Sequence, residues 1–175
     1  MPGSKQILAL CGSIRAHSSN KDLIRAIGLL YPGQAALELY EGLDQLPHFN
    51  PDLLPDRVPA TVNDFIRRIR QADGILISTP EYAMGLPGVL KNALDWTVAT
   101  AAFSGKPVLA ITASTSGTKA HDNLLGILQV LEAVMTPGTQ LLIPFIKTKV
   151  NQAAQITDPD TLEQISEAMD CFLQL

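Results

Sequence analysis

The hydrophobic positions of the chain alternate between short continuous apolar runs and stretches with helical spacing. Continuous runs bounded by glycine, proline or polar residues are typical of strands buried on both faces, as in a parallel sheet. Apolar residues at i, i+3, i+4 and i+7 predict a helix with one buried face, as Val62, Phe65, Ile66 and Ile69 do. The continuous runs predict five strands, over residues 6–11, 36–41, 75–79, 108–113 and 139–145.

Helical segments separate these strands. Ser19 or Asn20 is suited to cap the first helix, and Pro87 is suited to be the first residue of the third. Residues 42–59 carry four prolines and are predicted to form a long loop. The predicted helices are 21–30, a segment around 62–69, 87–96, 124–135 and a final helix opened by Asp158 and Pro159.

Alternating strands and helices predict an α/β fold in a single domain, residues 1–175. Apolar strands joined by helical crossovers form a parallel sheet with helices on both faces, and right-handed crossovers make it doubly wound. Ligands bind such sheets beyond the carboxyl ends of the strands, where the strand order reverses. The candidate ligand-binding segments are therefore the loops 12–20, 80–86 and 114–118.

The first of these loops is rich in hydrogen-bonding side chains. It follows a predicted strand and precedes a predicted helix, whose N-terminus favours an anion. It lacks both the G-x-G-x-x-G fingerprint of dinucleotide sites and the Gly-Lys-Ser/Thr ending of a Walker A loop. A loop of hydroxyls with one guanidinium suits a phosphate monoester, and the alternative is a polar turn that caps the helix. The side chains concerned are Ser13, Arg15, Ser18, Ser19 and Asn20.

The second loop, within residues 79–88, contains two prolines and two glycines. These residues interrupt ladder pairing and leave backbone N–H groups free to meet a planar heterocycle, which Tyr82 could flank. The alternative is a tight strand-to-helix connection. The third loop, 114–118, consists of small residues and indicates little by itself.

Together, Gly12–Arg15 with Ser18 and Asn20, Thr79–Tyr82 and Pro87–Trp96 resemble the motifs of the NADPH-dependent FMN reductase family. This family of flavodoxin-like proteins includes quinone, chromate and azo-compound reductases. The resemblance implies a five-stranded sheet of order 2-1-3-4-5 with bound FMN. It also implies NADPH or NADH as hydride donor, a quinone-like, flavin or metal-oxyanion acceptor, and a homodimer or homotetramer.

The resemblance also implies roles for individual residues. Four residues of the first loop would hold the FMN phosphate, namely Ser13, Arg15, Ser18 and Asn20. Pro80–Tyr82 would line the isoalloxazine edge, and the third loop would approach the flavin. Ala83 departs from the family pattern, which has Asn or another polar residue there, and Gly117-Thr118 replaces a Gly-Gly pair. The predicted cofactor-binding residues are Ser13, Arg15, Ser18, Ser19, Asn20, Pro80, Glu81, Tyr82, Ala83, Ser114 and Gly117.

No side chain is predicted to be a catalytic acid or base, because a bound flavin carries the chemistry. His121 and Asp122 follow Ser114 and Ser116 in sequence, but no G-x-S-x-G elbow supports a hydrolase. No metal site is predicted, since the acidic residues and the histidines lack ligand spacing.

Charge and cysteine content limit the possible partners. Charged residues make up 17% of the chain and the net charge is −4, which argues against a nucleic-acid partner. No apolar run approaches the roughly 20 residues of a membrane helix. Cys11 and Cys171 are not in a C-x-x-C motif and are expected to be reduced thiols, so a cytoplasmic location is expected. The scarcity of charge is expected to reflect a buried sheet and a subunit interface.

Two other functions are compatible with the same pattern. One is a flavin-binding electron carrier without NAD(P)H activity, although carriers that dock electrostatically are expected to be more acidic than −4. The other is a flavodoxin-like domain that binds no flavin and serves as a binding module.

Overall fold

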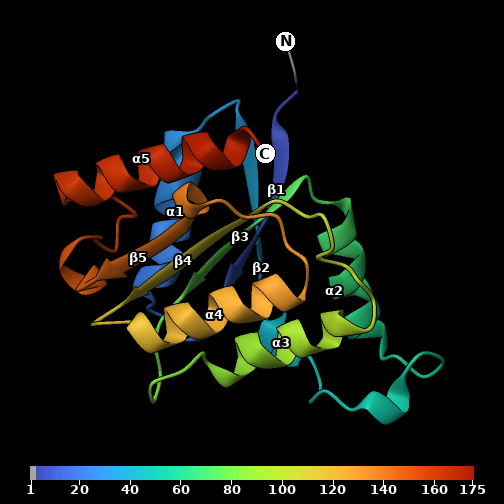
Figure 1. Ribbon diagram of the computed structural model, residues 1–175. Helices are drawn as coiled ribbons and strands as arrows, with labels where there is room; N and C mark the ends of the chain where they lie inside the picture. The colour runs from blue at the N-terminus through green and yellow to red at the C-terminus, as the bar shows by residue number, and fades with distance from the viewer. Residues whose placement is uncertain (1–2) are drawn as a thin grey trace.

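A central parallel sheet organises the computed structural model, which describes residues 3–175 (Figure 1). All neighbouring strands are parallel, in the order β2-β1-β3-β4-β5. The predicted order is therefore confirmed, and the winding reverses between β1 and β3. The strands are β1 (Lys5–Cys11), β2 (Ala35–Tyr40), β3 (Gly74–Thr79), β4 (Val108–Ser114) and β5 (Gln140–Pro144).

Helices cover both faces of the sheet, as predicted. In Figure 1, α1 and α5 lie on one face, and α2, α3 and α4 lie on the other. Alternate strand residues supply the two cores: Leu8 and Leu10 pack with α2, α3 and α4, while Ile7 and Ala9 pack with α1 and α5. The helices are α1 (Ser19–Leu30), α2 (Ala60–Gln71), α3 (Gly88–Val98), α4 (Thr118–Val130) and α5 (Pro159–Leu173). Within residues 3–175, none of them is both long enough and apolar enough to span a membrane.

The prediction of a helix over 124–135 is wrong at its C-terminal end, because α4 stops at Val130. Glu132 has a φ of 58°, which is incompatible with a continuing helix. Val134 then lies beside the sheet, where its carbonyl oxygen accepts from the N–H of Val108 at 2.9 Å. The apolar residues after α4 therefore cover the start of β4 instead of adding a helical turn.

The start of α1 also differs from the prediction. Ser18, and neither Ser19 nor Asn20, occupies the N-cap position, and its side chain makes no capping hydrogen bond. The first amides of an α-helix have no partner within the helix. In α1, the side chain of the N-cap residue does not accept a hydrogen bond from these amides.

The proline-rich loop 42–59 contains two short 3₁₀ turns, Leu43–Gln45 and Pro51–Leu53. Trp96 of α3 holds this loop, since its Nε1 donates to the carbonyl oxygen of Pro47 at 2.8 Å. The ring of Phe49 packs edge-on against the indole, with centroids 5.1 Å apart. Trp96 is fully buried and serves the core of this face.

Candidate functional site

A cavity of about 780 Å³ lies beyond the carboxyl ends of β1, β3, β4 and β5. Sites for small molecules and cofactors usually measure about 300–1,000 Å³. Four segments contribute to its wall, within residues 13–22, 80–82, 113–115 and 145–152. The first three correspond to the loops that the sequence indicated, and they meet at the switch point of the sheet.

Most of the residues predicted to bind a cofactor share this wall: Ser13, Arg15, Ser18, Ser19, Asn20, Pro80, Glu81, Tyr82 and Ser114. Ala83 and Gly117 are not among the lining residues. Ala83 lies in an exposed turn beyond Tyr82. Gly117 has a φ of 94°, and a Cβ there would lie 3.0 Å from side-chain carbons of Thr112 and Leu142. Gly117 therefore shapes the connection between β4 and α4.

The first loop is held close to the sheet by Gly12. A Cβ at this position would lie 2.2 Å from Oγ1 of Thr79, which is fully buried in β3. The N–H of Gly12 donates to the carbonyl oxygen of Ser78 at 2.9 Å. Ser13 follows directly, and its Oγ lies 3.4 Å from Oη of Tyr82. The first and second loops are thus joined at the cavity.

Asn20 joins three elements beneath the cavity. Its side chain is buried, its Nδ2 donates to the carbonyl oxygen of Ala113 (3.0 Å), and its Oδ1 accepts from Oγ of Ser78 (2.8 Å). Ser78 belongs to β3 and Ala113 to β4, so the amide fixes the start of α1 against two strand ends. Asn20 is therefore a positioning residue for the first loop.

Glu81 ties the second loop to the third. Its backbone N–H donates to Oγ of Ser114 at 3.1 Å, and its Oε2 accepts from the N–H of Ala120 at 2.9 Å. Ala120 lies in the first turn of α4, whose N-cap residue, Gly117, has no side chain to supply that acceptor. A carboxylate near a helix N-terminus also interacts favourably with the helix dipole. The side chain of Glu81 is thus engaged within the protein.

A tight hairpin turn follows at the cavity mouth. The N–H of Tyr82 donates to the carbonyl oxygen of Gly85, and the reverse bond also forms, both at 3.0 Å. The central residues, Ala83 (φ 48°) and Met84 (φ 61°), are both left-handed. This is the backbone of a type I′ turn, which favours Asn-Gly. Ala and Met are strained in it.

We expect Ala83→Asn with Met84→Gly to raise the free energy of unfolding by about 1 kcal/mol, since both replacements suit left-handed backbone. Urea denaturation measures the change. Ala99→Asn is the matched control, because Ala99 is exposed but right-handed (φ −74°) and should gain nothing. An unchanged or lower free energy of unfolding in the hairpin variant would contradict the assignment of strain to this turn.

The fourth segment of the wall was missed by the sequence reasoning. It follows β5 and includes Phe145 and Lys147, both exposed. Phe145 has a φ of 56°, and its N–H donates to the carbonyl oxygen of Thr115 at 3.3 Å. The only available signal was topological: the carboxyl end of a fifth parallel strand lies at the same edge as the others.

Burial favours the neutral form of two titratable side chains, Cys11 and His121. Burial raises the pKa of the Cys11 thiol, whose Sγ donates to the carbonyl oxygen of Ser13 at 3.4 Å. Burial lowers the pKa of His121, whose Nδ1 lies 3.0 Å from Oγ1 of Thr112. His121 thus contacts a buried threonine of β4.

The residues of the cavity suit FMN. The first loop combines the uncapped start of α1 with Ser13, Ser18 and Arg15, which suits a phosphate. The second loop lines the same cavity with Pro80–Tyr82, and the side chain of Glu81 is directed to α4. The sequence model of a protein family described as NADPH-dependent FMN reductase matches residues 6–148 of this chain. The chain belongs to this family.

Similar proteins agree with this assignment. A quinone reductase of Escherichia coli K12 is 32% identical over 174 residues, covering 95% of this chain and 93% of that protein. A 2-hydroxy-1,4-benzoquinone reductase of a Burkholderia species is 31% identical, covering 95% and 93% respectively. The flavoenzyme NAD(P)H:acceptor oxidoreductase FerB of Paracoccus denitrificans has a TM-score of 0.83 at 28% identity and covers 97% of this chain and 96% of its own.

Family membership confirms three predictions made from the sequence. The resemblance to FMN reductases holds, the protein is an NAD(P)H-dependent FMN oxidoreductase, and FMN is its cofactor.

Proposed function

We propose that this FMN reductase reduces quinones or similar planar aromatic acceptors at the cavity beyond β1, β3, β4 and β5. The main support is that a single cavity is lined by both of the first two loops. The hydroxyls and the guanidinium of the first loop suit a phosphate, and the backbone atoms of the second suit a planar ring. The names of the E. coli and Burkholderia relatives, both quinone reductases, point to the same acceptor class.

Each loop has a distinct task in this proposal. The guanidinium of Arg15, the hydroxyls of Ser13 and Ser18, and the amides at the start of α1 bind the phosphate. Backbone atoms of Pro80–Tyr82 and the third loop at Ser114 contact the flavin ring. Ser19 adds a further hydroxyl to the first loop, while Asn20 and the side chain of Glu81 hold these loops in place.

When bound, FMN supplies the two-electron chemistry, taking hydride from a nicotinamide and reducing the acceptor. The chain itself provides a fixed polar end and an open apolar mouth. Tyr82 (44% exposed) and Phe145 (62% exposed) both line the cavity and present aromatic surface to an incoming ring. No side chain needs to move a proton in this scheme, because the mouth is open to water.

The decisive experiment begins with the absorbance spectrum of the purified protein. We expect a flavin spectrum that bleaches when NADPH or NADH is added anaerobically and returns when a quinone is added. A yellow colour that persists with both nucleotides would favour an electron carrier. A colourless protein whose melting temperature does not respond to FMN would favour a binding module.

The size of the FMN response can be anticipated. A ligand at 100 times its Kd stabilises the native state by about 2.7 kcal/mol. For a chain of this length, that corresponds to a rise in melting temperature of roughly 5–10 °C. Differential scanning fluorimetry with FMN measures it, and riboflavin at the same concentration is the control for the phosphate.

We also propose that the chain forms a homodimer or a pair of dimers in a reducing cytoplasm. In Figure 1, α3 and α4 lie side by side on one face of the sheet. Val98 near the end of α3 and Val130 at the end of α4 are 55% and 75% exposed. A second copy would remove such apolar surface from water. Light scattering measures the mass, and a monomer at micromolar concentration would contradict the proposal.

A further inference from the structure

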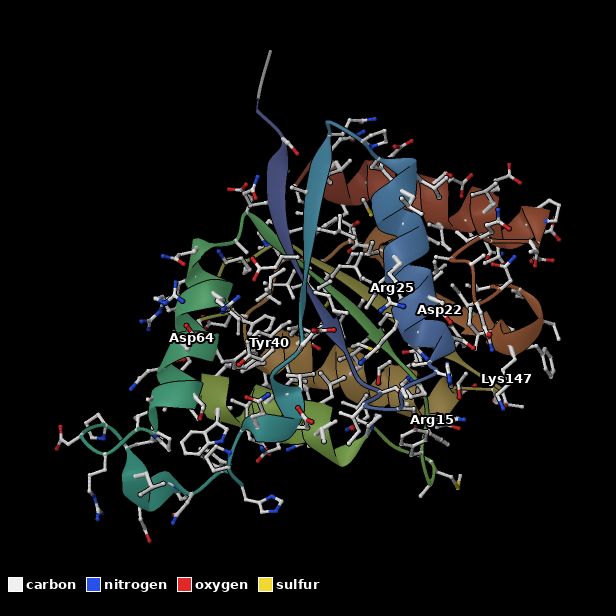
Figure 2. All side chains as sticks on the ribbon, turned by 180° about the vertical axis from the view of Figure 1, so that it is seen from behind. Arg15, Asp22, Arg25, Tyr40, Asp64 and Lys147 are labelled. Atoms are coloured by element: carbon white, nitrogen blue, oxygen red, sulfur yellow. The ribbon has the colours of Figure 1, made fainter. Side chains whose placement is uncertain are left out.

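Lys147 brings a second positive charge to the wall of the cavity, in addition to that of Arg15. Figure 2 shows Arg15 and Lys147 at the same end of the molecule, near the N-terminal end of α1 and away from Tyr40 and Asp64. Both line the cavity, Arg15 from the loop after β1 and Lys147 from the loop after β5. Within residues 3–175, neither side chain forms an ion pair.

The loop after β5 is fixed in a way that leaves this lysine exposed toward the cavity. Ile146 (4% exposed) and Val150 (6% exposed) are buried in the core beneath α1 and α5. Lys149 is directed elsewhere, with its Nζ 3.6 Å from Oδ2 of Asp158. The loop thus presents Lys147 and Thr148 to the cavity, while Ile146 and Val150 anchor it in the core.

Asp22 places a negative charge in the same wall of the cavity. It lies in the first turn of α1, its side chain is 14% exposed, and Nη1 of Arg25 lies 3.5 Å from its Oδ1. A carboxylate beside a phosphate dianion is unfavourable, because like charges repel most strongly where water is partly excluded. Arg15 alone would therefore face both a dianion and a nearby carboxylate.

We propose that Lys147 is a binding residue for the phosphate of FMN, and that the loop after β5 is the fourth segment of the cofactor site. This inference rests on the proposed function of the cavity. The ammonium and the Arg15 guanidinium approach the phosphate from different loops, while Asp22 limits the affinity. A lysine acts on phosphate as a point charge, so the contribution is electrostatic and sensitive to salt.

Flavin binding tests the proposal without any measurement of catalysis. Flavin fluorescence quenching gives the Kd of the apoprotein for FMN and for riboflavin, which lacks the phosphate. We expect Lys147→Met to weaken FMN binding by roughly tenfold at low salt and by less at high salt. Riboflavin binding should stay within about twofold.

Three further variants control the result. Lys149→Met removes a lysine from the same loop that does not line the cavity, and should leave both Kd values unchanged. Lys147→Arg should restore FMN binding, since it keeps the charge. Asp22→Asn should tighten FMN binding by about two- to fivefold, because it removes the opposing charge.

The possible failures are distinguishable. Equal FMN affinity in Lys147→Met and the unaltered protein overturns the proposal, and so does an equal loss for FMN and riboflavin, which would indicate a disturbed loop. A protein that binds no FMN even with Lys147 intact would instead overturn the assignment of the cavity to the cofactor.

Discussion

Purified Arg15→Ala protein should contain little or no FMN. Arg15 lines the cavity beside the uncapped N-terminal end of α1 and forms no ion pair within residues 3–175. Its guanidinium can meet two phosphate oxygens at once. Hydrogen bonds to charged groups contribute about 1.5–3 kcal/mol, so we expect FMN to bind roughly 10- to 100-fold more weakly. Flavin content after purification and the FMN Kd of the apoprotein measure the loss.

The controls separate charge recognition from folding. Arg67→Ala removes an exposed arginine of α2, remote from the cavity, and should retain its flavin. Riboflavin binding by Arg15→Ala should change little, because riboflavin lacks the phosphate. Unchanged flavin content in Arg15→Ala would show that the first loop does not bind phosphate through this residue.

Asn20→Leu should cause a large loss of stability. It removes the buried amide, so Oγ of Ser78 loses its acceptor and the carbonyl oxygen of Ala113 loses its donor. Each buried polar group left unsatisfied costs about 1–3 kcal/mol. We expect the free energy of unfolding to fall by about 2–5 kcal/mol, which urea denaturation measures.

A double-mutant cycle tests the origin of that loss. Ser78→Ala removes one of the two orphaned groups in advance, so Asn20→Leu should cost less in the Ser78→Ala background than alone. Additive losses would mean that Asn20 and Ser78 do not stabilise the protein through their mutual hydrogen bond. FMN affinity should fall in Asn20→Leu as well, since the start of α1 loses its attachment to β3 and β4.

Much of the fold could be predicted because its signals are local. A buried strand such as Ile75–Thr79 shows itself as a continuous apolar run, and the inner face of α2 shows itself at Val62, Phe65 and Ile66. The end of α4 could not be predicted in this way. The apolar residues after Val130 have helical spacing, but their partner is the start of β4.

The residues of the candidate site also fall into two groups: those that a local sequence pattern indicates and those that only the fold brings to the cavity. Ser13, Arg15 and Ser18 could be named because they follow a strand and precede a helix, a context visible in sequence. Phe145 and Lys147 could not, since nothing in their own loop indicates a ligand, and they reach the cavity only because β5 lies beside β4.

By itself, the sequence determined the parallel sheet, its two covered faces and which loop brings several hydroxyls and a guanidinium to the cavity. These features depend on residues two to four positions apart, or on the order of elements along the chain. Only the tertiary structure decided what holds the site together. Asn20 bonds to residues 58 and 93 positions away, and Glu81 supplies an acceptor to α4 from 39 positions away. Such ties exist because strand pairing brings distant loops to one edge of the sheet, and no local pattern specifies which of them will meet.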